Sequence, residues 1–113
     1  MNTTVSFEIA ELLQEKRIVI YSDYRYTDFK GIIRLERDAS AVFPFAPTIA
    51  DVVMWLYEKH GVWISVLHKR RSENKYFDYE IKLPNGMEIY SWDHNSPTEA
   101  GEAAIEYTLN ELI

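Results

Sequence analysis

Three histidines are the side chains in this sequence best suited to acid–base or metal chemistry. They stand at His60, His68 and His94, with Asp93 beside the last of them. Their separations do not match the spacing of a metal-binding motif, and no HExxH pair occurs. The chain has no cysteine, which excludes thiolate zinc sites, iron–sulfur clusters and disulfides. We therefore predict no metal, no cofactor and no catalytic residue.

Neither the paired carboxylates nor the glycines of this sequence indicate an enzymatic site. Asp78 and Glu80 alternate with apolar residues, which places them on the solvent face of a strand, where nothing would raise a carboxyl pKa. Each of the four glycines is expected in a turn or a helix cap, so none remains for a phosphate-binding loop. No nucleophile elbow is present. We expect a protein that is not an enzyme.

One basic cluster is expected at the tip of a hairpin, and it consists of His68, Lys69, Arg70, Arg71 and Lys75. It either contacts a phosphate backbone or is a solvated hairpin end with Glu73 inside it. The formal charge of −6 repels polyanions at long range. A nucleic-acid-associated module is therefore the alternative function, and we do not expect nucleic acid or a membrane to be the partner.

Aromatic residues supply the leading functional hypothesis, since the chain holds eight Tyr, five Phe and three Trp. Exposed aromatic patches often mark binding surfaces. The alternative is that the first hairpin or the last helix covers them, because a register slip of one residue exchanges the two faces of a strand. We predict contact with a protein partner or with a second copy, through Met54, Trp55, Trp63, Tyr90 and Trp92.

Three helices are expected to position these residues. Thr48 and Asp51 form a capping-box pattern, and Gly61 is placed to end that helix in a left-handed conformation. Another helix runs from Ser6 to about Lys16. The last helix opens with a capping box and a proline, Ser96-Pro97-Thr98-Glu99. The predicted core faces are Ile9, Leu12 and Leu13; Ile49, Val52, Val53, Leu56 and His60; and Ile105, Leu109 and Leu112.

Five strands follow from alternation and turn signals. Asn85-Gly86 is a strong hairpin signal, Thr27–Lys30 is expected to join the first two strands, and 37–47 reads as a loop. Val42, Phe43 and Phe45 of this loop are expected to fold back on the core. The predicted strands are Ile18–Tyr26, Gly31–Glu36, Val62–Lys69, Tyr76–Leu83 and Met87–Trp92.

The element order α-β-β-α-β-β-β-α predicts an α+β fold, with one antiparallel sheet of about five strands and helices mainly on one face. A length of 113 residues fits a single domain. The amino terminus lacks the pattern of a signal peptide, and no apolar segment approaches the roughly 20 residues that cross a bilayer. We expect a soluble cytoplasmic protein.

Residues 48–113 resemble double-stranded RNA-binding domains in their helix–three strands–helix order. The stretch Glu99-Ala100-Gly101-Glu102-Ala103-Ala104 is similar to the alanine-rich second helix of that family. The family places phosphate-binding lysines at the start of this helix, where Thr98 and Glu99 stand here. Glu102 and Glu106 follow them, and an acidic stripe repels phosphate. The resemblance therefore implies the topology but not the RNA binding.

A second resemblance covers most of the chain. The stretches PTIADVVMWLYEKHGVWISV and SPTEAGEAAIEYTLNELI resemble small prophage and mobile-element proteins of gut Bacteroidetes-type bacteria. The resemblance implies a bacterial, intracellular, accessory role, and it implies no particular chemistry.

Overall fold

In the part of the chain that the structure describes, three α-helices and five antiparallel strands follow one another in the predicted order, which confirms the α+β class. The computed structural model describes residues 3–71 and 74–113. Its elements are α1 (Phe7–Glu15), β1 (Tyr24–Phe29), β2 (Ile32–Arg37), α2 (Ile49–His60), β3 (Trp63–Arg71), β4 (Asn74–Lys82), β5 (Glu88–His94) and α3 (Pro97–Tyr107), which a π-helical turn, η1 (Thr108–Leu112), continues.

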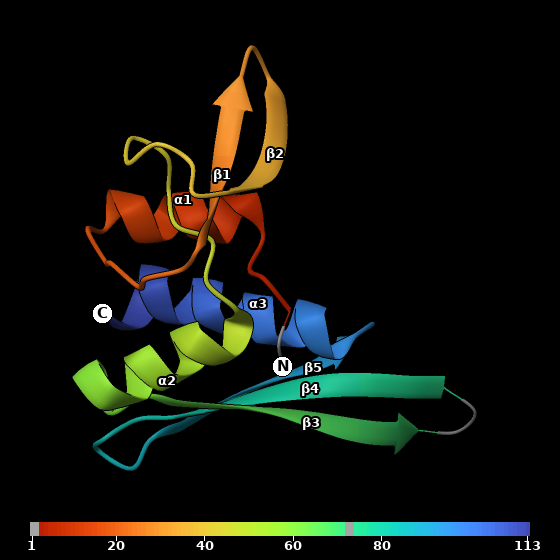
Figure 1. Cartoon of the computed structure of the whole chain (residues 1–113). Coiled ribbons are helices and arrows are strands. Elements are labelled where there is room, and N and C mark those ends of the chain that lie inside the picture. Colours follow the sequence, from red (N-terminus) through yellow and green to blue (C-terminus); the bar gives the residue numbers. More distant parts are fainter. Residues whose placement is uncertain (1–2, 72–73) are drawn as a thin grey trace.

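The strands form two sheets, so the predicted single sheet of about five strands is wrong. β1 and β2 form a hairpin, and β3, β4 and β5 form a separate meander. Both edges of β1 are occupied, because segment 44–46 lies along the edge opposite β2: Tyr26 N–H donates to Pro44 O, and Ala46 N–H donates to Tyr24 O. In Figure 1, α2 and α3 cover one face of the meander, and α1 stands between α3 and the hairpin.

The core lies between the helices and the inner face of the meander. Helix α3 and the start of η1 pack closely on their neighbours because one strip carries small residues, Ala100, Ala104 and Thr108, all fully buried. Gly101 also lies inside α3 and is buried, so the expectation that every glycine serves a turn or a cap is wrong. The core includes Ile9, Leu13, Ile49, Val52, Leu56, Ile64, Ile81, Ile105 and Leu109.

The predicted caps of α2 are confirmed. The Thr48 hydroxyl accepts from Asp51 N–H at 3.1 Å, and the Asp51 carboxylate accepts from Thr48 N–H at 3.3 Å. Gly61 ends the helix at φ 67°. His60 was predicted on the core face and is exposed instead, because it is the last residue of α2 and its ring rests beside Trp55, at 5.4 Å between ring centroids.

The predicted capping box of α3 forms only in part. The Ser96 hydroxyl accepts from Glu99 N–H at 3.0 Å, as expected. The Glu99 carboxylate accepts from Asn95 N–H at 3.0 Å, one residue before the N-cap. The Ser96 hydroxyl therefore caps the helix as in a capping box, but the Glu99 carboxylate binds the amide of Asn95 instead of the amide of Ser96.

The predicted strand Ile18–Tyr26 begins too early. The apolar alternation is present, since Ile18 and Ile20 pack against the core while Val19 and Tyr21 are exposed. This segment nevertheless has no ladder partner among the described residues, and β1 begins only at Tyr24. Alternation shows which side faces the core, but a strand also requires a neighbour to pair with.

The predictions for the β1–β2 connection and for the loop 37–47 both need correction. The β1–β2 hairpin turns at Lys30 and Gly31, at φ 55° and 82°, so the predicted Thr27–Lys30 connection lies mostly within β1. Two consecutive residues with positive φ are typical of a type I′ turn. The loop that follows was predicted to fold back on the core, but Phe43 and Phe45 pack on the exposed rings of Phe29 and Tyr21, and Val42 is 74% exposed.

The Asn85-Gly86 hairpin is present, in a longer form than a two-residue turn. Leu83 N–H donates to Met87 O and Gly86 N–H donates back to Leu83 O, which encloses a three-residue loop that starts with Pro84. Only Gly86 has positive φ, at 88°. Three-residue loops of this kind combine an ordinary turn with one left-handed glycine.

Candidate interaction surface

The strand register places Trp63 and Tyr90 on the face of the meander that the helices do not cover. Trp63 lies opposite Lys82, and Tyr90 lies opposite Glu80. Cross-strand partners share a face, and the alternate residue Ile81 is fully buried on the other one. Helices α2 and α3 pack on the covered face of the meander (Figure 1).

Trp63, Tyr90 and Trp92 are 37%, 52% and 62% exposed, and we call these three residues the outer aromatic face. The alternative prediction, that the first hairpin or the last helix covers them, is wrong. Trp92 follows Tyr90 by two residues and continues its alternation along β5. A role of these residues in binding stays a prediction.

Tyr57 of α2 contacts this face at the Trp63 ring, and the sequence analysis did not single it out. Its ring meets Trp63 edge-to-face, with 5.3 Å between centroids, and it is half exposed. The two residues lie on either side of the Gly61 turn, which folds the end of α2 back towards the start of β3. A search for aromatic pairs that flank a helix-ending glycine would have found it.

Met54 and Trp55 lie away from the outer aromatic face. They belong to α2, which packs on the opposite side of the meander (Figure 1). Met54 is exposed, whereas Trp55 is partly buried against the core. The structure therefore divides the five candidate residues between two separate surfaces.

A β-bulge in β5 shapes the end of the face that holds Trp92. The ladder shifts between Phe77 and Tyr79, so β5 carries one extra residue there. Asp93 adopts φ 67°, a conformation that Asp tolerates better than most residues, and its N–H donates to the Asp78 carboxylate at 3.3 Å.

The prediction that Asp78 and Glu80 are solvent-facing carboxylates is wrong. Asp78 is only 3% exposed, because the bulged backbone of β5 lies against it. The Glu80 side chain is 14% exposed, and its carboxylate lies 3.6 Å from the Lys82 ammonium. Both carboxylates therefore lie on the outer side of the meander but are themselves largely covered by neighbouring groups of the chain.

The Tyr90 hydroxyl is already used within the chain. It donates a short hydrogen bond to the Glu88 carboxylate. This bond, more than any other contact, raises the pKa of Tyr90 to about 12, because ionising the phenol would break the bond and place two negative charges together. Tyr90 therefore stays neutral at physiological pH and offers its ring, more than its hydroxyl, to a partner.

The histidines do not assemble into a site. His94 stacks on Tyr79 and shares a 3.0 Å hydrogen bond with Ser91, while His68 stacks on Phe77 with 4.8 Å between centroids. His60 lies at the end of α2. Within residues 3–71 and 74–113, no three acidic, histidine or cysteine side chains gather closely enough to hold a metal ion.

The basic cluster lies along the two strands that meet at the β3–β4 turn. Both strands run further towards this turn than the predicted Val62–Lys69 and Tyr76–Leu83, so the backbone of Arg70, Arg71 and Lys75 belongs to the arms of the β3–β4 hairpin rather than to its tip. The side chains of Lys69, Arg70, Arg71 and Lys75 lie outside the described residues, and so does Glu73. Nucleic-acid contact at this end of the hairpin stays a prediction.

A cleft of about 200 Å³ lies between the end of α1 and the 41–47 loop. Its lining has no Asp, Glu or His, and its charged members are Arg17 and Arg25. The Arg25 guanidinium donates to Phe43 O at 2.5 Å and lies 3.6 Å over the Phe45 ring centroid. Arg25 therefore holds the loop against β1.

Comparison with protein-family models, curated proteins and solved structures found no match to this chain. Across the described residues, no helix is both long and apolar enough to cross a membrane.

Proposed function

We propose that this chain is a small, non-enzymatic accessory protein of a bacterial mobile element, and that it acts by binding another protein. The outer aromatic face is the proposed contact. The single observation that carries the proposal is the exposure of Trp63, Tyr90 and Trp92 on the side of the sheet opposite the helices.

The energetics of such a face favour binding. Removing one large apolar side chain from water contributes roughly 1.5–3 kcal/mol, and aromatic rings lose little conformational freedom when they are covered. Interfaces draw most of their energy from a few central aromatic or arginine residues. Here the rings stand on a three-stranded sheet packed against two helices, so little ordering is required on association.

The chemistry of the face indicates the kind of partner surface. Tyr90 donates to Glu88, and Glu80 pairs with Lys82, so these polar groups are satisfied within the chain. What remains for a partner is ring surface. We propose a partner that presents a flat, mainly apolar protein surface to the rings.

Site-specific photo-cross-linking in the cells that naturally make the protein tests this proposal. A photoreactive residue at position 92 is expected to give a discrete protein adduct that Tyr90→Ser weakens. The matched control carries the same group at Val19, which is 70% exposed but lies away from the meander. Equal adducts from both positions, or none from position 92, would overturn the proposal.

A further inference from the structure

Strand β2 presents a bare sheet edge. Its only ladder partner among the described residues is β1, and all six of its residues are exposed. Figure 1 shows the hairpin projecting beyond α1, with β2 on its outer side. A two-stranded hairpin is marginally stable in water, and an exposed edge is a template for pairing with another strand. β2 is therefore a candidate for pairing between molecules.

The edge strand also exposes three large apolar side chains. Ile32, Ile33 and Leu35 are 57%, 46% and 43% exposed. The strand contains neither Lys nor Pro, and its charged residues are Arg34, Glu36 and Arg37. Pairing this edge with another strand would remove these three side chains in part from water.

The ladder phase shows which backbone groups of β2 are free. Asp38 N–H donates to Asp23 O at 2.9 Å, and the Thr27 hydroxyl donates to Arg34 O at 3.3 Å. Hydrogen-bonded and non-hydrogen-bonded pairs alternate along an antiparallel ladder. Ile32, Arg34 and Glu36 therefore direct their backbone groups towards β1. Those of Ile33, Leu35 and Arg37 point to the open edge.

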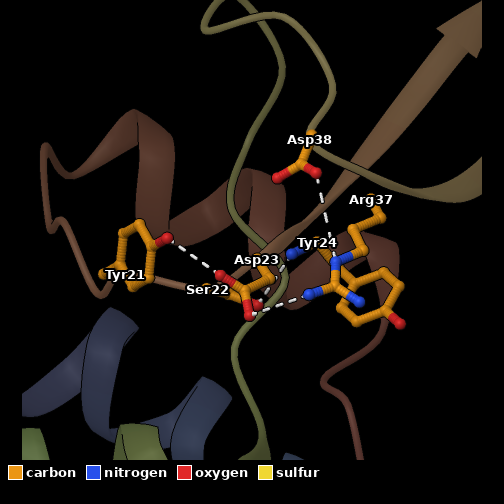
Figure 2. A network of polar contacts seen from close by, with 6 residues as sticks. All are labelled: Tyr21, Ser22, Asp23, Tyr24, Arg37 and Asp38. Carbon is orange, nitrogen blue, oxygen red and sulfur yellow. Dashed lines mark hydrogen bonds and ion pairs between the residues drawn. The ribbon is translucent and has the colours of Figure 1, made fainter.

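Of the three charged side chains of β2, one has ion-pair partners among the described residues and two do not. Figure 2 shows Arg37 between two carboxylates, at 3.9 Å from Asp23 and 4.0 Å from Asp38. Arg34 and Glu36, in contrast, have no ion-pair partner among the described residues. Arg25, which lies opposite Glu36 in the ladder, is turned to Phe43 O and the Phe45 ring.

We infer that β2 pairs in antiparallel fashion with β2 of a second copy of this chain, about a twofold axis through Leu35. In this register Leu35 faces the partner's Leu35, and Ile33 faces the partner's Arg37. Arg34 then faces the partner's Glu36, and the symmetry repeats this pair. A register centred on Arg34 or on Glu36 would instead place like charges directly opposite, which is unfavourable.

This dimer leaves the outer aromatic face open and does not depend on its function. The hairpin and the meander are separate sheets on opposite sides of α1 and α3 (Figure 1). Two hairpins paired through β2 form one continuous four-stranded sheet, with segment 44–46 of each copy along the outer edge of its β1.

Sedimentation over micromolar to submillimolar concentrations, with charge-reversal variants, tests the register. Arg34→Glu replaces two attractive contacts with two repulsive ones, so we expect it to weaken dimerisation about tenfold or more. Glu36→Arg should do the same. The double variant Arg34→Glu/Glu36→Arg should restore the wild-type dissociation constant to within about twofold. Lys59→Glu, the same charge change on the exposed surface of α2, is the matched control.

A second measurement does not depend on charge. The chain has no cysteine, so Leu35→Cys carries a single thiol. Hydrogen-bonded antiparallel pairs hold their Cα atoms about 5.5 Å apart, within the range of a disulfide. Mild oxidation should link Leu35→Cys into dimers and leave the exposed Val42→Cys control mainly monomeric. A wild-type chain that stays monomeric throughout, or a dimer that survives Arg34→Glu and does not link through position 35, overturns the proposal.

Discussion

The backbone N–H of Ser6 donates a 2.6 Å hydrogen bond to the carboxylate of Glu102, a residue 96 positions further along the chain. Ser6 is the N-cap of α1, so this carboxylate lies at the positive end of that helix dipole. The bond joins α1 to the middle of α3. A residue that belongs by pattern to an acidic stripe therefore holds the first helix in place.

Removing this carboxylate should destabilise the fold. We expect Glu102→Ala to lower the free energy of unfolding by about 2 kcal/mol, because the bond has a charged acceptor and the Ser6 amide is partly buried. Glu102→Gln should lose less, since it keeps an acceptor. Urea denaturation measures both. Glu106→Ala, an exposed position on the same helix, is the control and should change stability by less than about 0.5 kcal/mol. Equal losses at 102 and 106 would contradict the proposed role.

Gly61 should tolerate no side chain. It has φ 67°, and a Cβ there would lie 2.9 Å from Pro84 Cγ. The left-handed conformation alone costs a residue with a Cβ roughly 1–2 kcal/mol, so Gly61→Ala should lose about 2 kcal/mol or more. Gly86→Ala is the matched control, because Gly86 also has positive φ but has open space around its Cβ position. Thermal unfolding should show the larger loss at position 61, and Pro84→Ala should reduce the difference.

At Arg17, in contrast to Gly61, a change to glycine should stabilise the fold. It has φ 58° just after α1, where Ile18 N–H donates to Leu13 O and Arg17 N–H donates to Gln14 O. This is the hydrogen-bond pattern of a helix end that glycine favours. Arg17→Gly should raise the free energy of unfolding by about 0.5 kcal/mol, the strain relieved less the added flexibility of the unfolded chain. A destabilised variant in chemical denaturation would show that the arginine side chain contributes more than its backbone strain costs.

The pKa of Tyr90 reports the Tyr90–Glu88 contact directly. The pKa is about 12 with the Glu88 carboxylate as acceptor, against an ordinary value of 10. A raised folded-state pKa stabilises the fold at pH below the unfolded value, and this contribution is lost as pH rises through about 12. Glu88→Gln should lower the pKa of Tyr90, as followed by phenolate absorbance. Tyr90→Phe identifies the transition that belongs to this residue. An unchanged titration in Glu88→Gln would show that the contact does not form.

The outer aromatic face should be dispensable for folding. We expect Trp92→Ser and Tyr90→Ser to change the free energy of unfolding by less than about 1 kcal/mol, because both side chains are more than half exposed. Ile81→Ala, on the buried face of the same sheet, should cost roughly 2–5 kcal/mol. Denaturant titrations compare the three. A large loss in Trp92→Ser would mean that the residue is structural, and the argument for a binding surface would then fail.

Local features were predictable where they depend on neighbours in the chain. The capping pair Thr48 and Asp51 and the stop at Gly61 lie within one helix and its ends, and the structure confirms them. The alternation of Phe77, Tyr79 and Ile81 placed β4 and its inner face correctly. The exposure of Trp63 and Tyr90 followed from the same alternation once the register was known.

Features that depend on distant partners were not predictable. Ile18–Ser22 alternates as a strand does, but no neighbour pairs with it in the described structure. Asp78 has the sequence context of a solvated carboxylate, yet a bulge 15 residues away buries it. Neither outcome leaves a local pattern, because each depends on which backbone lies alongside.

The sequence alone determined the order of the helices and strands and most of the residues that face the core, since these depend on periodicity and on caps formed within a few residues. Only the tertiary structure decided that the five strands divide into two sheets. The reason is that segment 44–46 occupies the second edge of β1, while α1 and α3 lie between the hairpin and the meander. That arrangement leaves both the β2 edge and the outer aromatic face open, and these are the two surfaces through which we propose the protein acts.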